Sequence, residues 1–200
     1  MCLHRTAVTV ASWRLRMTKR RLDYLATEQG HMDDDTDGFL GKVIEIAMVV
    51  PDYRVTLAEL SRAGIGPWRI HTIDPSNTTD QTYRGKPASF SMKVCFAEMG
   101  DVVWEVIQPI SGPSIFQEFL DRGGRGLHHV AYSCNDIDFD ERIDGFRRRG
   151  FEFAQGGDWN GGCRFAFFLT GPDDGTCLET IAFSRDWTYP SAEERYPPLT

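Results

Sequence analysis

Three glutamates lie in the middle of apolar, strand-like runs, where a carboxylate is unusual. They are Glu45 in VIEIAMVV, Glu105 in VVWEVIQP and Glu179 in CLETIAF, and His129 holds an equivalent place in LHHVAYS. Burying an unpaired carboxylate costs several kcal/mol, so such a group generally has a partner or a metal ion. We therefore expect the four side chains to converge on one site. The alternative for Glu105 and Glu179 is that they form ion pairs with an interior arginine such as Arg164.

The composition is that of an ordinary globular protein, and it argues against some classes of function. Of 200 residues 41% are hydrophobic, and the formal net charge is −7. This acidity argues against nucleic acid or an anionic membrane as the main partner. No apolar run approaches the roughly 18 residues that a membrane-spanning helix needs. The five cysteines show no metal-ligand spacing, which predicts reduced thiols and a cytoplasmic location.

Both ends of the chain differ from its middle. Residues 1–40 begin rich in arginine and then turn acidic. We expect a disordered N-terminal extension there, with an organellar transit peptide or a misassigned upstream start codon as alternatives. Residues 185–200 carry three prolines and are predicted to form an extended tail. The folded domain is therefore expected to span residues 41–184.

Within this domain the same order of elements occurs twice. Each pass is predicted to contain a strand, a helix and three further strands, in modules at about 42–110 and 126–183. A short helix is expected to connect them at 113–121. Two stretches, the polar residues 74–87 and the glycine-rich residues 156–162, are expected to be loops. The pattern of short strands and helices predicts an α+β fold.

The repeat places the four ionisable residues at matching positions. The first strand of each pass carries Glu45 or His129, and the last strand carries one of the other two glutamates. Strand alternation puts Glu45 on the same face as Ala47, and His129 on the same face as Ala131. The small side chains of Ala47 and Ala131 leave room for a ligand on that face.

These features resemble the vicinal oxygen chelate superfamily, which contains glyoxalase I, methylmalonyl-CoA epimerase and extradiol dioxygenases. The most specific element is GLHHVAYSCNDID at residues 126–138, which is similar to the epimerase-like branch. The stretch EVIQPISGPSIFQEFLDRGGRGLHH also resembles that branch. The resemblance implies two βαβββ modules that form a half-open, barrel-like mixed sheet around a central metal site.

The same resemblance implies one divalent metal ion with four protein ligands. They would be Glu45, Glu105, His129 and Glu179. Relatives often have histidine at the first of these places, so Glu45 is left open as a ligand, a base or both. Three carboxylates and one imidazole suit Zn, Co, Ni, Mn or Mg, and spacing alone does not choose among these metals.

The activity implied by the resemblance is that of a metal-dependent epimerase or isomerase of a small carbonyl or acyl-CoA compound. The metal would stabilise the enolate that forms when an α-proton leaves. Glu45 and Glu179, on opposite sides of the metal, are implied as the catalytic bases. A glyoxalase-like lyase and a metal-free small-molecule binding protein remain alternatives. An extradiol dioxygenase fits less well, because its iron site uses two histidines and one carboxylate.

Two further expectations concern the substrate and the assembly. Phe165 and Phe167 lie on one face of a predicted strand, and they are candidate substrate-binding residues. His128 is expected to point away from His129 and to be packed or hydrogen-bonded. Proteins of this fold often assemble as dimers, which leaves a homodimer open.

Overall fold

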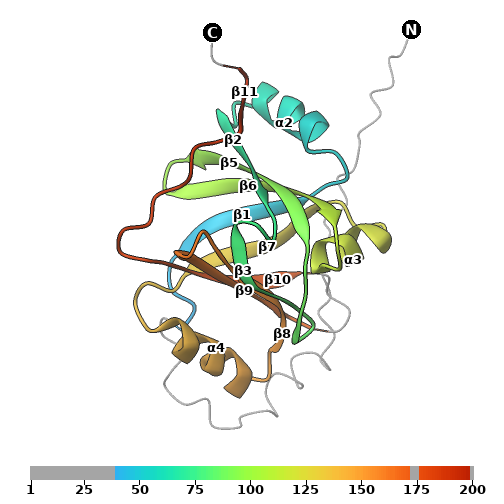
Figure 1. Ribbon diagram of the computed structural model, residues 1–200. Coiled ribbons are helices and arrows are strands. Elements are labelled where there is room, and N and C mark those ends of the chain that lie inside the picture. Colours follow the sequence, from blue (N-terminus) through green and yellow to red (C-terminus); the bar gives the residue numbers. More distant parts are fainter. Residues whose placement is uncertain (1–38, 172–175, 199–200) are drawn as a thin grey trace, which may run out of the picture. The chain divides into compact units, whose positions relative to one another are not determined.

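The computed structural model describes residues 39–171 and 176–198, so the predicted N-terminal extension lies almost wholly outside the described residues. In the described part, one mixed sheet is accompanied by short helices (Figure 1). The elements follow in the order β1 (Val43–Val49), α2 (Tyr53–Arg62), β2 (Trp68–Ile73), β3 (Thr78–Tyr83), β4 (Lys86–Pro87), β5 (Ser91–Met99), β6 (Val102–Ser111), α3 (Ile115–Asp121), β7 (Gly126–Ser133), α4 (Phe139–Arg148), β8 (Glu152–Trp159), β9 (Cys163–Leu169), β10 (Cys177–Phe183) and β11 (Glu194–Tyr196).

The order of strands in the sheet displays the duplication. The eleven strands follow one another as β11-β2-β5-β6-β1-β7-β10-β9-β8-β3-β4. The first module contributes β2-β5-β6-β1, and the second contributes the mirrored series β7-β10-β9-β8. At the centre β1 pairs antiparallel with β7, and each of them has a parallel neighbour, β6 or β10. The predicted α+β fold of two βαβββ modules in one mixed sheet is confirmed.

The connection from β2 to β5 corrects one expectation. Residues 74–87 do not form a simple loop, because they contain β3 and β4. β3 crosses to the second module and pairs antiparallel with β8. Its inward positions are Thr78 and Gln81, and the amide of Gln81 exchanges two hydrogen bonds of 3.0 and 3.1 Å with the backbone of Phe90. Polar residues in buried positions hide the alternation that normally reveals a strand.

The glycine-rich stretch at 156–162 is also not a loop throughout, because β8 continues to Trp159. A Cβ atom on Gly156 would lie 2.9 Å from the carbonyl oxygen of Phe165. On Gly157 it would lie 2.8 Å from Cζ of the same phenylalanine. A side chain at Gly156 would meet the β9 backbone and one at Gly157 would displace the ring of Phe165, so the two glycines allow β8 to pack closely against β9.

The sheet curls until the outer strands of the two modules approach each other. Only residues 74–77 separate β2 from β3, and so short a link spans at most about 18 Å. The ring centroid of His71 in β2 accordingly lies 5.4 Å from that of Trp159 in β8. The inner face of the curled sheet encloses an apolar cluster that includes Val94, Phe96 and Phe167.

Helices α2 and α4 cover the other face of the sheet, one for each module (Figure 1). Leu57 of α2 belongs to a cluster with Cys95 of β5. The residues before and after Cys95 face the interior, so Cys95 and Leu57 lie on the outer face of the sheet. Phe146 of α4 stacks on Phe168 with ring centroids 4.0 Å apart. Both helices begin at an aspartate whose carboxylate accepts hydrogen bonds from two backbone amides of the first turn. Equivalent caps in both modules are a further trace of the repeat.

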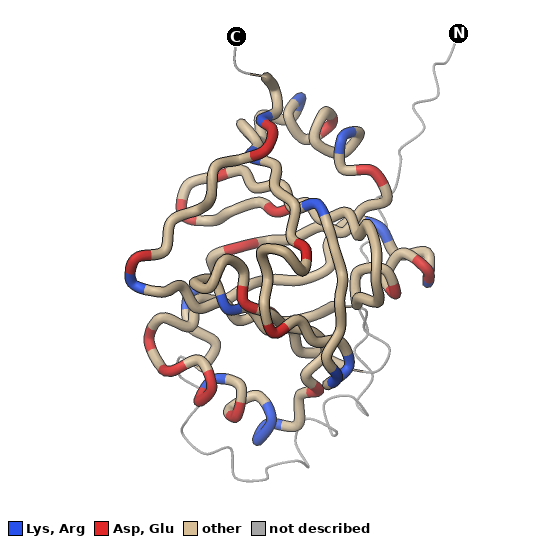
Figure 2. Tube along the Cα trace, viewed as in Figure 1, with Lys and Arg blue, Asp and Glu red and all other residues tan. Residues whose placement is uncertain are grey.

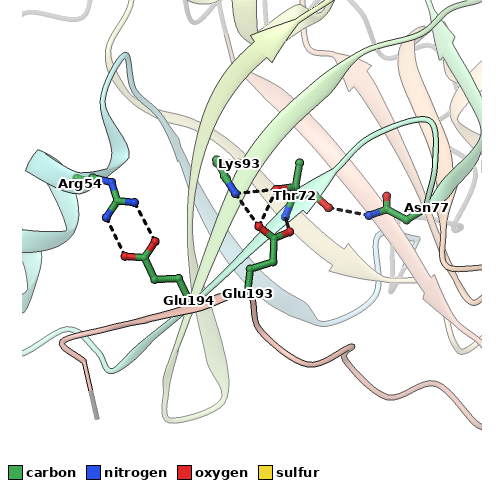
Figure 3. A network of polar contacts seen from close by, with 6 residues as sticks. All are labelled: Arg54, Thr72, Asn77, Lys93, Glu193 and Glu194. Carbon is green, nitrogen blue, oxygen red and sulfur yellow. Dashed lines mark hydrogen bonds and ion pairs between the residues drawn. The ribbon is translucent and has the colours of Figure 1, made fainter. Parts of the chain in front are cut away.

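The C-terminal segment is fastened to the first module by a polar network (Figure 3). Its strand β11 pairs antiparallel with β2. Arg54 of α2 donates two hydrogen bonds, of 2.7 and 2.9 Å, to Glu194. Glu193 accepts hydrogen bonds from the backbone amide and hydroxyl of Thr72 and from the ammonium group of Lys93. The network holds the segment that leads from β10 to β11 across the sheet.

Among the described residues, no helix is long and apolar enough to cross a bilayer. The four described cysteines are buried and free.

Charged residues lie mainly on helices and loops (Figure 2). Acidic residues on the central strands are therefore exceptional, and they lead to the site described next.

Candidate metal centre

The four side chains singled out in the sequence meet in the interior of the curled sheet. Ligand atoms of Glu45, Glu105, His129 and Glu179 all lie within 4.8 Å of one another. Their residues are 5%, 7%, 2% and 4% exposed, respectively. The expected convergence on one site is therefore present in the structure, and each of the four residues comes from its own strand.

The register of the central strands explains half of this convergence. Glu45 in β1 and Glu179 in β10 are both paired with Ala131 in β7. The three residues form one row across the sheet and point to the same face. Because Ala131 carries only a methyl group, the two carboxylates can lean towards each other above it.

The neighbouring row explains the other half. Glu105 in β6 and His129 in β7 are both paired with Ala47 in β1. Ala47 is fully buried. It lies between Glu105 and His129 in this row, as Ala131 lies between the two glutamates in the first row. Two alanines thus form the floor of the site, as expected from the strand alternation.

The ligand atoms at the centre of the site lie close enough to one another to share one ion. Nε2 of His129 lies 3.1 Å from Oε2 of Glu179 and 3.4 Å from Oε2 of Glu105. Both Nε2 of His129 and Oε2 of Glu179 are buried without a hydrogen-bond partner. An unsatisfied buried polar atom costs about 1–3 kcal/mol. A cation between these atoms would satisfy both, so the residues present fit a divalent metal ion.

The protonation of the cluster leads to the same conclusion. Burial raises the pKa of Glu45 well above its usual value, and the charges of Glu105 and Glu179 raise it further. Burial likewise raises the pKa of Glu179 to about 7. Burial alone would lower the pKa of His129, but the carboxylates of Glu105 and Glu179 outweigh it and raise this pKa to about 9. Protons here neutralise negative charge that a divalent cation would neutralise as well.

Arg164 does not neutralise the glutamates. Its side chain is 44% exposed and forms an ion pair of 2.7 Å with Asp140. The interior ion-pair alternative considered from the sequence is therefore wrong for this arginine. Its strand neighbours face the interior, whereas Arg164 itself points outward, so strand alternation accounts for the difference.

The three glutamates of the cluster, Glu45, Glu105 and Glu179, border a small cavity of about 40 Å³. Phe165 and Phe167, the candidate substrate-binding residues, both line it. Trp159 and Tyr189 line it as well, and sequence reasoning missed both of them. Trp159 follows two glycines that indicated a loop, and Tyr189 lies in the expected tail. Phe167 also contacts the site directly, because its ring centroid is 4.9 Å from that of His129.

A second histidine adjoins the site. Nδ1 of His128 lies 2.9 Å from Nδ1 of His129, and His128 is 2% exposed. The expectation that His128 is packed or hydrogen-bonded is met, but the expectation that it points away from His129 is wrong, because the two rings are in contact. Its partner is the unexpected part, because neighbouring strand residues ordinarily face opposite sides.

Comparisons with known proteins agree with this fold. The family model described as the glyoxalase/bleomycin resistance protein/dioxygenase superfamily matches residues 45–167. The uncharacterized protein YqjC of Bacillus subtilis (strain 168) is 41% identical over 44 residues, which cover 22% of this chain and only 31% of that protein.

Two solved structures are similar in fold. A hypothetical protein from Bacillus halodurans C-125 has a TM-score of 0.55 and 20% identity, with 74% of this chain and 98% of the other covered. Methylmalonyl-CoA epimerase from Mycobacterium tuberculosis has a TM-score of 0.54 and 16% identity, with 77% of this chain and 94% of the other covered. At these identities the similarity concerns the fold alone.

Proposed function

The chain belongs to the glyoxalase/bleomycin resistance protein/dioxygenase superfamily, and from this premise we propose that it is a divalent-metal-dependent epimerase or isomerase of a small carbonyl or acyl-CoA compound. The observation that carries the proposal is the pair of buried carboxylates, Glu45 and Glu179, on either side of Ala131. An epimerase needs one group to remove an α-proton and another group to return it from the opposite side. Glu45 and Glu179 meet this need.

The metal would be held by Glu45, Glu105, His129 and Glu179. When bound, a divalent ion supplies Lewis acidity towards the substrate oxygens and stabilises the negative charge that develops as the α-proton leaves. Zn, Co, Ni, Mn and Mg are the candidate ions for this set of carboxylate and imidazole ligands.

The two glutamates would exchange the proton. In the metal-free protein burial raises the pKa of Glu179 to about 7, so its surroundings favour a proton on this carboxyl more than water does, as suits a general acid-base catalyst. The pKa of Glu45 is raised even more clearly, by burial and by the neighbouring carboxylates. One of the two glutamates would remove the α-proton and the other would return one, and the roles would reverse for the opposite stereoisomer.

The cavity restricts what can react. A volume of about 40 Å³ is far below the roughly 150 Å³ of a cavity that accommodates benzene. Only the reacting group of a substrate fits there, and a larger part such as a CoA moiety would lie outside. Phe165 and Phe167 would pack against the reacting group and exclude bulk water, which strengthens the electrostatic interactions inside.

Metal analysis and proton exchange together test the proposal. Purified protein should contain about one equivalent of a divalent metal, and it should exchange the α-proton of a 2-oxo, 2-hydroxyketone or acyl-CoA compound for solvent deuterium. Interconversion of the stereoisomers of the exchanged compound supports an epimerase, whereas net bond cleavage or formation would favour a glyoxalase-like lyase. Protein that binds no metal and exchanges no proton would overturn the proposal in favour of a metal-free binding protein.

A further inference from the structure

We propose that His128 is a positioning residue, which fixes the orientation and tautomer of His129 so that the Nε2 atom of His129 is free to bind a metal. The inference rests on the proposed metal site and adds a residue that acts on it from outside. Its physical basis is the short contact between the two imidazoles, at 2.9 Å between the Nδ1 atoms.

A β-bulge brings His128 into position. In the pairing of β7 with β1, His129 is opposite Ala47 and Leu127 is opposite Met48, so His128 is the extra residue between them. A bulge of this kind redirects the side chain of the extra residue. His128 therefore reaches its neighbour's ring, which regular alternation would not allow.

The hydrogen bond between the rings allows only two arrangements, because one Nδ1 must donate and the other must accept. If His128 donates, a neutral His129 carries its proton on Nε2 and cannot bind a metal through that atom. If His129 donates, its Nε2 has a free lone pair. Nε2 of His129 has no hydrogen-bond partner even though Oε2 of Glu179 is 3.1 Å away. Metal binding through Nε2 requires the second arrangement, with His128 as the acceptor.

The connecting helix α3 holds the acceptor ring in place. The rings of Phe116 and Phe119 pack edge-to-face against His128, with centroids 5.3 and 4.9 Å away. Phe116 also lies 6.0 Å from the ring of His129. The helix between the two modules thus supports the metal site from behind. Such outer partners typically change metal affinity by about 10–100-fold when they are removed.

Nitrogen NMR on histidine-labelled protein tests the tautomer directly. In the zinc-loaded protein, His129 should carry its proton on Nδ1, and His128 should carry its proton on Nε2. His128 should keep a bare Nδ1 in the metal-free protein as well, so the inference can be tested even if zinc fails to bind. A proton on Nδ1 of His128 in either form would overturn it.

Zinc titration of two matched variants tests the consequence. His128→Leu removes the acceptor and should weaken zinc binding about 10–100-fold, with a mixture of His129 tautomers. His128→Asn places an amide oxygen near the former Nδ1 and should recover most of the affinity and the single tautomer. Wild-type zinc affinity and an unchanged tautomer in His128→Leu would contradict the inference. If zinc-loaded wild-type protein shows the expected tautomers but exchanges no α-proton, the result would count against the proposed function alone.

Discussion

Glu45 and Glu179 face each other across Ala131. Ala131 in β7 is paired with Glu45 of β1 on one side and with Glu179 of β10 on the other. Strands two places apart lie about 9–10 Å from each other, a distance that two glutamate side chains can bridge only over a small residue. The methyl group of Ala131 therefore sets the space in which the carboxylates and a metal can meet.

Enlarging this alanine should close the site. Ala131 is fully buried, so the two added methyl groups of Ala131→Val would enter the space between the carboxylates and cost about 1–3 kcal/mol of stability. We expect zinc affinity to fall at least about tenfold, the equivalent of 1.4 kcal/mol. Isothermal titration and thermal unfolding would measure the two effects. Ala182→Val, at a half-buried position outside the four-residue site, is the control, and equal zinc affinity in both variants would contradict the prediction.

Replacing one carboxylate should separate proton transfer from metal binding. Glu179→Gln keeps an oxygen ligand but removes the basic group, so α-proton exchange should fall by about 10²–10⁴-fold while bound metal is retained. Deuterium incorporation followed by NMR and metal analysis provide the readouts. Glu59→Gln, on the exposed face of α2, should behave as wild type. Full exchange in Glu179→Gln would remove this residue from the mechanism.

The metal-free protein should lose stability as pH rises from about 5 to 9. The pKa of Glu179 is raised from 4.5 to about 7 by burial, and that of His129 is raised from 6.5 to about 9 by Glu105 and Glu179 despite burial. The native state therefore binds more protons than the unfolded state in this range, and the free energy of unfolding falls with pH. The stabilising contribution of His129 is complete below pH 6.5 and is lost as pH rises through 9.

A bound metal should reverse this trend, because it takes the place of the protons. Melting temperatures measured in EDTA and in excess zinc should diverge as pH increases. In Glu179→Gln the metal-free dependence between pH 5 and 7 should become shallower. A melting temperature in EDTA that is constant or rises over this range would refute the protonation scheme.

The C-terminal segment should be loosened by loss of one anchor. Glu193→Ala removes the hydrogen bonds to Thr72 and Lys93, so the exposed Arg185 should be cleaved faster by trypsin. The melting temperature should change little, because exposed ion pairs contribute at most about 1 kcal/mol. Limited proteolysis with mass spectrometry measures the first effect, and Glu59→Ala is the control. Unchanged cleavage would show that pairing between β11 and β2 holds the segment without this network.

The sequence predicted the four-residue cluster because each part of the argument was local. Glu45 and His129 stand out within their own strands, and the repeat places them at equivalent positions. Alternation then identifies Ala47 and Ala131 as the residues beside them. Such patterns survive in a single sequence because the inner face of these strands is otherwise apolar.

Other parts of the site depend on contacts that no local pattern reports. The role of His128 follows from a bulge that breaks alternation. Thr78 and Gln81 are polar residues in buried positions, so their strand was mistaken for a loop. Tyr189 borders the cavity only because the segment that carries it is tied to a distant strand. These features became visible only with the tertiary structure.

The pairing of β11 with β2 has a consequence for biosynthesis. Ile70 in β2 pairs on its outer side with Glu194, so this side of the β2 backbone remains open until β11 has been synthesised. An unpaired strand at the edge of a sheet is a template for another chain. Shortened forms that stop before residue 193 should therefore self-associate through β2, and β11 protects the complete domain against aggregation.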